Sequence, residues 1–408
     1  MRRPVNSNHT GYLLWAILAG VLLGIICGAW FGPAMLGVEW LGTLFLNALK
    51  MMIIPLIIAA VVTGVASLGD VRKLGRVGGF TVFYYASTTA VAVILGLIIV
   101  NIIQPGAGAA NLSTEVPETV AARETIGVAD IVLSMVAPNL VAAAAETQLL
   151  PLIVFSLVFA AALTTIGERG KTLLAFFEGL NETMMKLVVW IMYFAPVGIF
   201  ALVASRLGQA GGGQAFIQEI SAVGLYVATV LIGLSFHFVF LFVVLRIFAN
   251  GGFEFLRTML RALLTAFGTA SSSATLPLTM ECAKEAGADE RAVRFVLPLG
   301  ATINMDGTAL YEAVAVMFIA QAYGFEMGIT EQIVIFLTAT LAAIGAAGIP
   351  QAGLVTMIIV LTAVNLPLEG IGLLLAVDWF LDRFRTAVNV WGDSVGSAVI
   401  SRLIRTDT

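Results

Sequence analysis

Long apolar stretches separated by short polar ones fill the first 250 residues of the chain. Six of them lie near 12–37, 41–68, 77–103, 127–166, 183–206 and 220–249. A helix needs about 20 residues to cross a bilayer. The fourth stretch contains Pro138 and Glu146 and is predicted to consist of shorter helical pieces. The pattern predicts an all-α polytopic membrane protein whose first stretch is a transmembrane helix rather than a cleaved leader.

The last 155 residues follow a different pattern. The stretches near 253–286 and 332–364 are interrupted at their centres by Gly, Ser and Pro, so each arm is too short to cross a bilayer. Each is followed by an apolar helix with a polar centre, near 292–322 and 371–401. Such short, interrupted segments in two halves indicate a transporter binding site. The first is flanked by Lys and Arg and the second is not, which predicts inverted repeats of re-entrant hairpins.

Composition excludes several classes of protein. Hydrophobic residues make up 60% of the 408 positions and charged residues 11%, whereas a soluble domain has about 25% charged residues. The net charge of −4 gives no basic surface for nucleic acid. The two Cys and two His residues form no metal-ligand motif, and Cys27 and Cys282 are expected to be free buried thiols.

The last helix carries five polar residues on one face: Asp378, Asp382, Arg385, Asn389 and Asp393. At about 100° per residue they fall within roughly a quarter of the helix circumference. A charge at the bilayer centre costs at least about 2.5 kcal/mol. This stripe of five polar residues on one helix face therefore requires an explanation. The charges either neutralise one another between helices or form a pocket for a charged substrate and cations, and the repeated hairpins favour the pocket. Arg383 lies off the stripe and is expected to pair or to line the pocket wall.

The preceding helix contains Asn304-Met305-Asp306-Gly307-Thr308 in an apolar setting. This sequence favours a local break, which frees carbonyl oxygens for hard cations. Four residues further on, Glu312 is predicted to lie deep in the membrane. Burial disfavours its charged form, so Glu312 is either a proton carrier or a hydrogen-bonded structural acid.

These motifs, with Ser271-Ser272-Ser273 and the small residues 345–353, resemble those of the glutamate/aspartate carriers, the dicarboxylate/amino acid:cation symporter family. The resemblance covers nearly the whole chain. It implies eight transmembrane helices, two re-entrant hairpins and a homotrimer that works by an elevator mechanism. A scaffold would comprise about 12–76 and 127–206, and a mobile transport part about 77–103 and 220–402.

By the same resemblance, Arg385 holds the side-chain carboxylate of the substrate and Asp382 holds its ammonium group. Asn389 and the Ser272 amide hold the α-carboxylate. Glu312 matches the proton-coupling glutamate of animal carriers. Further substrate contacts match Ala270, Thr308, Ile349, Gly353 and Thr386. Sodium sites match Tyr85, Thr88, Thr89, Gly300, Thr302, Asn304, Met305, Asp306, Ala343, Ile344, Ala346, Asn389 and Asp393.

The expected function is import of acidic amino acids coupled to sodium and proton gradients, with sodium co-transported and no organic cofactor. The alternatives are a symporter for C4-dicarboxylates or neutral amino acids; a hydrolase using the serine run, or an ion channel, is less favoured. Arg385 favours a second carboxylate and Asp382 an amine. The chain lacks the long insertion that animal carriers have in the fourth stretch, which indicates a bacterial inner-membrane protein. Membrane lipid is an expected partner and nucleic acid is not.

Overall fold

The structure is a computed structural model that describes residues 7–66, 75–107, 133, 135–146, 148–209, 213–344 and 352–406. All regular elements within these ranges are helices, so the predicted all-α class is confirmed. The α-helices are α1 (Ser7–Phe31), α2 (Glu39–Ala66), α3 (Gly75–Ile103), α6 (Leu140–Ala145), α7 (Leu149–Thr165), α8 (Lys171–Met192), α9 (Ala195–Gln209), α10 (Gly213–Phe248), α11 (Phe253–Thr269), α12 (Ser272–Glu285), α13 (Glu290–Ile303), α14 (Asp306–Ala322), α15 (Ile329–Ile344), α16 (Ala352–Ala363) and α17 (Ile371–Thr406). Short 3-10 turns are η1 (Gly32–Val38), η4 (Gly167–Gly170) and η5 (Leu368–Gly370).

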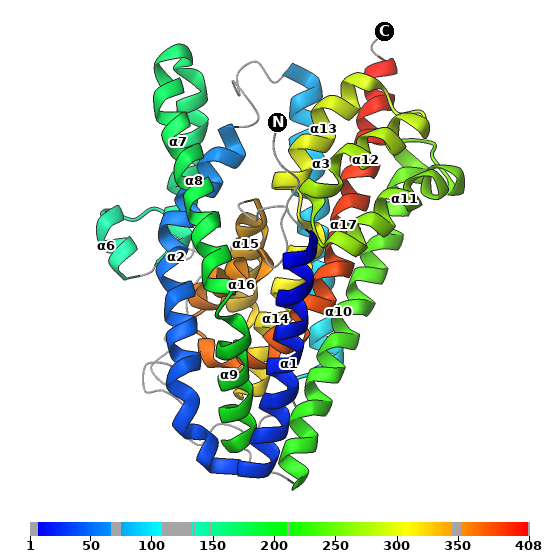
Figure 1. The fold of residues 1–408 in the computed structure, drawn as a ribbon. Coiled ribbons are helices and arrows are strands. Elements are labelled where there is room, and N and C mark those ends of the chain that lie inside the picture. The colour runs from blue at the N-terminus through cyan, green and yellow to red at the C-terminus, as the bar shows by residue number, and fades with distance from the viewer. Residues whose placement is uncertain are drawn as a thin grey trace.

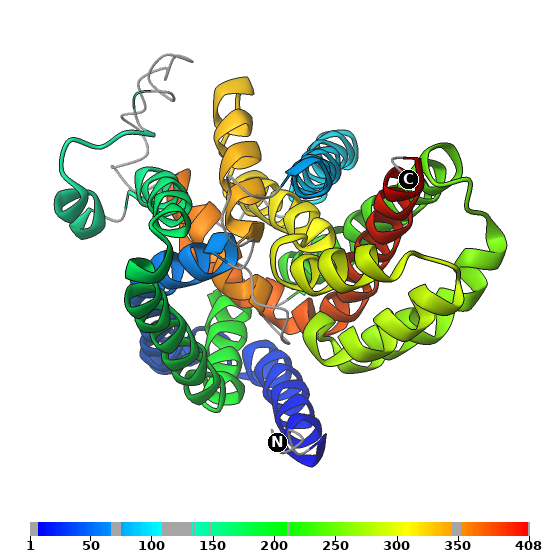
Figure 2. The ribbon, with the colours of Figure 1, turned by 90° about the horizontal axis from the view of Figure 1, so that it is seen from above.

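The helices pack in two groups. Helix α1 packs along α9, and α2 packs against α7, α8 and α9. Helix α17 packs against α10, α11, α13 and α14, and α3 packs against α14 and α10. Figure 1 shows α2, α7, α8 and α9 on one side of the molecule and α10, α11, α12 and α17 on the other. The view from above shows the same separation, with the yellow-green helices α11 and α12 beside the red α17 (Figure 2).

Four stretches of the described residues are long and apolar enough to cross a membrane by length and composition. They are Trp15–Ala66, Val77–Ile103, Ser221–Phe248 and Glu290–Ala322, the first of which holds both α1 and α2. Many large apolar side chains on these helices point outward, such as Trp30 and Phe83. An apolar exterior of this kind suits lipid as the surrounding solvent, as the composition indicates. These observations support a multi-pass membrane protein.

The predicted single stretch 183–206 is wrong in one respect. It is divided between α8 and α9, which meet at a bend of 56°. Pro196 is the second residue of α9. Its ring blocks continuation of the preceding helix, because a proline has no N–H and crowds the carbonyl four residues earlier. The bend therefore follows from a residue that lies inside the apolar stretch and does not interrupt its hydropathy.

Three predicted breaks are found in the described residues. The fourth stretch contains the short helix α6, capped by the Asn139 side chain, and then α7. The first hairpin consists of α11 and α12, separated at Ala270 and Ser271. The polar centre near 304 separates α13 from α14. The tip of the second hairpin, between α15 and α16, lies outside the described residues.

Three glycines bring α1 against the backbone of α9. A Cβ atom at Gly24 would lie 3.0 Å from the Phe200 carbonyl oxygen, and one at Gly28 would lie 3.0 Å from that of Ala204. A Cβ at Gly20 would clash with the Pro196 carbonyl oxygen. Residues four apart share one helix face, and small residues there allow helices in membranes to approach closely. The pair α1–α9 is thus held by backbone-to-backbone packing.

We expect Gly24→Leu to force α1 away from α9 and to destabilise the protein by about 1–3 kcal/mol, the usual cost of overpacking. The measurement is the thermal unfolding temperature of the purified protein in detergent. The matched control is Gly224→Leu on α10, where a new Cβ meets nothing within 4 Å. Equal unfolding temperatures for the two variants would contradict the close packing of α1 and α9.

Candidate functional site

The helix breaks place polar groups inside the bundle. Ala270 ends α11 in the left-handed conformation, with φ at +50°. The Ser271 hydroxyl then caps α12 by accepting the Ala274 N–H at 3.1 Å. The chain also leaves helical geometry at Asn304 and Met305, and Asp306 begins α14. These local ends leave backbone groups and short polar side chains facing α17.

The buried stripe of α17 forms a charge cluster. The Nη2 atom of Arg385 lies 2.8 Å from Asp382 Oδ1 and 3.0 Å from Asp378 Oδ1. The Arg385 side chain is fully buried. Both carboxyl groups therefore approach the same guanidinium nitrogen. Mutual pairing, one of the two explanations for the stripe, is therefore present, but it involves only one edge of the arginine.

The rest of the Arg385 guanidinium is held without hydrogen bonds. Its central carbon lies 3.9 Å from the centre of the Tyr311 ring, so the cation rests on the aromatic face. Its Nε and Nη1 atoms are buried and have no acceptor among the described residues. A Cβ at Gly353 of α16 would lie 2.7 Å from Nη1, so the absence of a side chain there lets the guanidinium approach α16. The unpaired Nη1 donor therefore faces the second hairpin.

One turn along α17, Asn389 joins the stripe to the break between α13 and α14. Its Oδ1 accepts the Gly307 N–H at 2.7 Å, and its Nδ2 lies 3.3 Å from the Thr308 hydroxyl and 3.2 Å from the Met305 sulfur. Asn389, Thr308 and Met305 therefore lie side by side. Thr386 packs beside Asp382, whose carbonyl accepts the Thr386 hydroxyl at 2.7 Å.

A second polar cluster surrounds Asp306. Its Oδ1 accepts the Thr89 hydroxyl at 2.7 Å and the Thr88 hydroxyl at 3.4 Å. Its Oδ2 lies 3.0 Å from His237 Nε2 on α10. Thr88 also lies 3.5 Å from Asn304 Oδ1. The cluster combines a carboxylate, an amide and two hydroxyl oxygens from three separate helices, which is a donor set suited to a hard cation.

Asp393 forms the centre of a third group. Its Oδ1 accepts the Asn304 amide at 3.0 Å. A Cβ at Gly300 would clash with this oxygen and would lie 2.6 Å from the Tyr85 hydroxyl oxygen. The absence of a side chain at Gly300 therefore lets Asp393 and Tyr85 approach the α13 backbone. The Tyr85 hydroxyl itself donates to the Val296 carbonyl at 2.7 Å.

The remaining predicted residues are less closely joined to these groups. Thr302 is exposed, and its hydroxyl is bonded to the Leu299 carbonyl at 2.8 Å. Ala343 and Ile344 end α15. Ile349 and Ala346 lie outside the described residues. Ser272 is buried in the first turn of α12.

The two further charged residues named from the sequence differ in their surroundings. Arg383 donates to the carbonyl oxygens of Phe267 and Gly268 at 3.1 and 2.8 Å, so it pairs with the end of α11. Glu312 is fully buried on α14, and both of its carboxylate oxygens lack a hydrogen-bond partner among the described residues. Helix α14 packs against α16 of the second hairpin.

Three residues of the site carry roles that the sequence did not indicate. His237 was assigned no role from the sequence, and it contacts Asp306. Tyr311 supports Arg385 with its ring. Asp378 was placed on the stripe but given no function, and it pairs with Arg385. An ionisable residue in an apolar span is a functional signal, so His237 and Asp378 could have been singled out.

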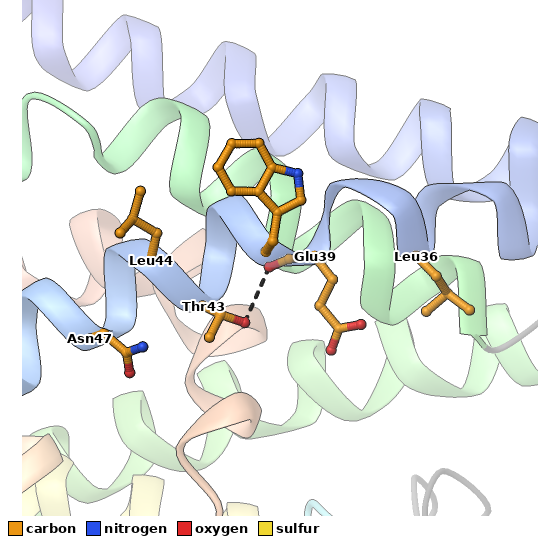
Figure 3. Close-up of a pocket in the computed structure, with 6 residues that line it drawn as sticks. Leu36, Glu39, Thr43, Leu44 and Asn47 are labelled. Atoms are coloured by element: carbon orange, nitrogen blue, oxygen red, sulfur yellow. Dashed lines mark hydrogen bonds between the residues drawn. The ribbon is translucent and has the colours of Figure 1, made fainter.

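An open groove of about 590 Å³ lies elsewhere, on the surface formed by η1 and α2. Figure 3 shows its lining, where Thr43 donates to the Glu39 carbonyl at 3.3 Å beside Leu36, Leu44 and Asn47. Neither element carries a residue of the buried polar clusters. Within the described ranges, no group of three or more His, Cys, Asp or Glu side chains could hold a metal ion. The buried clusters around α14 and α17 are therefore the candidate site.

The sequence matches known proteins over most of its length. Residues 13–403 match the Sodium:dicarboxylate symporter family. The chain is 39% identical to excitatory amino acid transporter 3 of Mus musculus over 98% of its own length and 87% of the relative's. It is 41% identical to excitatory amino acid transporter 3 of Homo sapiens, with coverage of 89% and 78%. It is 39% identical to excitatory amino acid transporter 1 of Ambystoma tigrinum, with coverage of 89% and 77%. The chain therefore belongs to the sodium:dicarboxylate symporter family, whose members are transporters and not enzymes.

Proposed function

We propose that this protein is a secondary transporter that imports glutamate or aspartate together with sodium ions. The observation that carries the proposal is the Arg385 guanidinium, buried on α17 with Nε and Nη1 lacking acceptors among the described residues. A buried cationic donor without a partner is costly, and a substrate carboxylate would satisfy it. A guanidinium can bind a carboxylate through two parallel hydrogen bonds, which gives both affinity and orientation. The names of the excitatory amino acid transporters support an acidic amino acid as the substrate.

The carboxylates beside Arg385 support an amine on the same substrate. Asp382 lies at the edge of the cluster, 2.8 Å from Arg385, and its side chain is 9% exposed. It can accept a hydrogen bond from a substrate ammonium group, and Asn389 and the Ser272 amide can bind the α-carboxylate. A C4-dicarboxylate would leave Asp382 without this cation. A neutral amino acid would leave Arg385 without an anion, so an acidic amino acid fits best.

The clusters around Asp306 and Asp393 are proposed as sodium sites. Each offers a buried carboxylate together with amide, hydroxyl or backbone oxygens, the ligands that hard cations prefer. Asn304 touches both clusters, since its Oδ1 faces Thr88 and its Nδ2 bonds Asp393. Asn389 connects them to the substrate cluster through Gly307. This sharing of ligands provides a physical route by which bound cations favour substrate binding.

We also propose how the protein moves its substrate across the membrane, and the basis for this is the packing of the helices. Helices α1, α2 and α6–α9 would form the static scaffold of a homotrimer in the bacterial inner membrane. The remaining helices, with α11–α12 and α15–α16 as re-entrant hairpins among eight spans, would move as an elevator. The stronger contacts within each group than between the groups support this division. Each net positive charge carried inward adds about 2.3 kcal/mol of driving energy per 100 mV.

Replacing Arg385 tests the substrate pocket. We expect Arg385→Ala to raise the KM for aspartate and glutamate at least about 30-fold, because loss of a buried charge partner costs about 2 kcal/mol or more. The measurement is uptake of labelled aspartate and glutamate into proteoliposomes under a sodium gradient. Arg385→Lys, which keeps the charge and loses the planar fork, should also raise KM.

The matched control for this test is Arg294→Ala. Arg294 is another arginine, but its side chain is 69% exposed and pairs only at the surface with Glu290. Surface ion pairs contribute little, so uptake should stay close to that of the unaltered protein. Unchanged acidic uptake in Arg385→Ala would refute the pocket. Better competition by succinate or serine than by aspartate would favour the alternative substrates.

Glu312 is proposed as the proton carrier. It is a fully buried carboxyl on α14, a helix that packs against α16 of the second hairpin. We expect Glu312→Gln to abolish the stimulation of uptake by an inward proton gradient while sodium-driven exchange of substrate continues, because the amide cannot gain or lose a proton. The measurement is uptake with the proton and sodium gradients varied separately. The control is Glu326→Gln at an exposed position, and persistent proton stimulation in Glu312→Gln would contradict the role.

A further inference from the structure

His237 is a fully buried polar residue in the middle of α10. Its neighbours along the helix are apolar, and the Phe240 ring stacks on the imidazole with centroids 5.6 Å apart. The contact with Asp306 joins α10 to the start of α14 across a long separation in sequence. Nothing in the substrate cluster explains why a histidine stands at this position of the helix.

The geometry defines the proton on the imidazole. Asp306 Oδ2 lies 3.0 Å from Nε2, and an ionised carboxylate only accepts hydrogen bonds. The contact is satisfied when Nε2 carries the hydrogen and donates to Oδ2. The Nδ1 atom is buried without a hydrogen-bond partner in the described part of the chain. With the hydrogen on Nε2, Nδ1 is a bare acceptor, and no buried N–H is left unpaired.

The second carboxylate oxygen of Asp306, Oδ1, is bound by a residue of helix α3. Oδ1 accepts from Thr89 on α3 at 2.7 Å, while Oδ2 is bound from α10. Hydrogen bonds to both oxygens from two helices fix the rotation of the carboxylate plane. A Cβ at Gly392 would lie 3.2 Å from Oδ2, so this glycine lets α17 approach the same oxygen.

Helix α10 is also anchored next to His237. The Phe238 ring stacks on Trp391 of α17 with centroids 5.2 Å apart. The Trp391 indole N–H donates to the Phe238 carbonyl at 3.2 Å. This contact fixes the depth of α10 against α17 and so determines how far the imidazole reaches toward Asp306. The histidine is thus part of a rigid frame and does not depend on a mobile segment.

We propose that His237 is a positioning residue that orients Asp306 for binding of the co-transported sodium ion. The inference rests on the proposed sodium-coupled function and adds a residue to it. Hydrogen-bond partners of metal-binding carboxylates hold them in the binding orientation, and their loss usually lowers metal affinity about 10- to 100-fold. His237 lies within hydrogen-bond distance of Asp306, the proposed sodium ligand, and does not itself coordinate the ion.

The test compares three substitutions of His237 at saturating substrate. His237→Gln can place an amide N–H near the position of Nε2, whereas the amide of His237→Asn stops one methylene short, and His237→Leu has no donor. We expect the sodium concentration for half-maximal uptake to rise about 10- to 100-fold in His237→Leu and His237→Asn. In His237→Gln it should stay within about 3-fold of the value for the unaltered protein. The maximal rate at saturating sodium should change little in all three. A second measurement follows the rise of the unfolding temperature with sodium concentration in the absence of amino acid, since binding to the folded state stabilises it.

The control is Ser235→Ala on the exposed side of α10, which removes only a hydroxyl that donates to the Leu231 carbonyl at 2.7 Å. Its sodium dependence should match that of the unaltered protein. The inference is overturned if His237→Leu and His237→Asn lower the maximal rate with no change in sodium dependence. It is also overturned if His237→Gln raises the sodium concentration for half-maximal uptake as much as His237→Leu does. Failure of the proposed function gives a different result, because the unaltered protein would then show no sodium dependence of uptake or of unfolding temperature.

Discussion

A guanidinium removed from water must be balanced by groups that the protein supplies, and this requirement organises the centre of the molecule. Asp378 and Asp382 compensate the charge of Arg385, and the Tyr311 ring supports one face of the cation. Removing one partner of a buried pair costs about 3–5 kcal/mol, so these residues have to be set together. The carboxylates satisfy one edge only. The two carboxylates thus compensate the charge of the buried Arg385, while its Nε and Nη1 donors have no acceptor among the described residues.

The polar clusters exist because helices end inside the bundle. The break at Asn304 and Met305 sets Asp306 at the start of α14, and its side chain meets hydroxyls from α3. Irregular backbone at membrane depth is tolerated only where it is buried in protein or lines a cavity. Here the break is fully packed by α17 and α3, and Asn389 accepts the freed Gly307 N–H. The same asparagine connects the break to the charged stripe.

Sequence patterns were informative where chemistry is local. The spacing of Asp378 through Asp393 placed them on one helix face, and the Asn304–Thr308 motif indicated a break; both are found. Patterns were less informative for contacts between distant segments. The bend between α8 and α9 does not disturb hydropathy, and the His237–Asp306 contact joins residues 69 apart. Hydropathy reports how a segment is solvated, whereas such pairs are determined by how whole helices cross.

Helix α17 continues without a break from Ile371 to Thr406. At 1.5 Å per residue, Asp382 and Asp393 are separated by about 16 Å along its axis. An unbroken helix is stiff in length, so the two carboxylates keep this spacing whatever the surrounding helices do. Any displacement of α17 therefore moves the arginine cluster and the Asp393 group by the same amount, so the two groups are mechanically tied to each other by one continuous backbone.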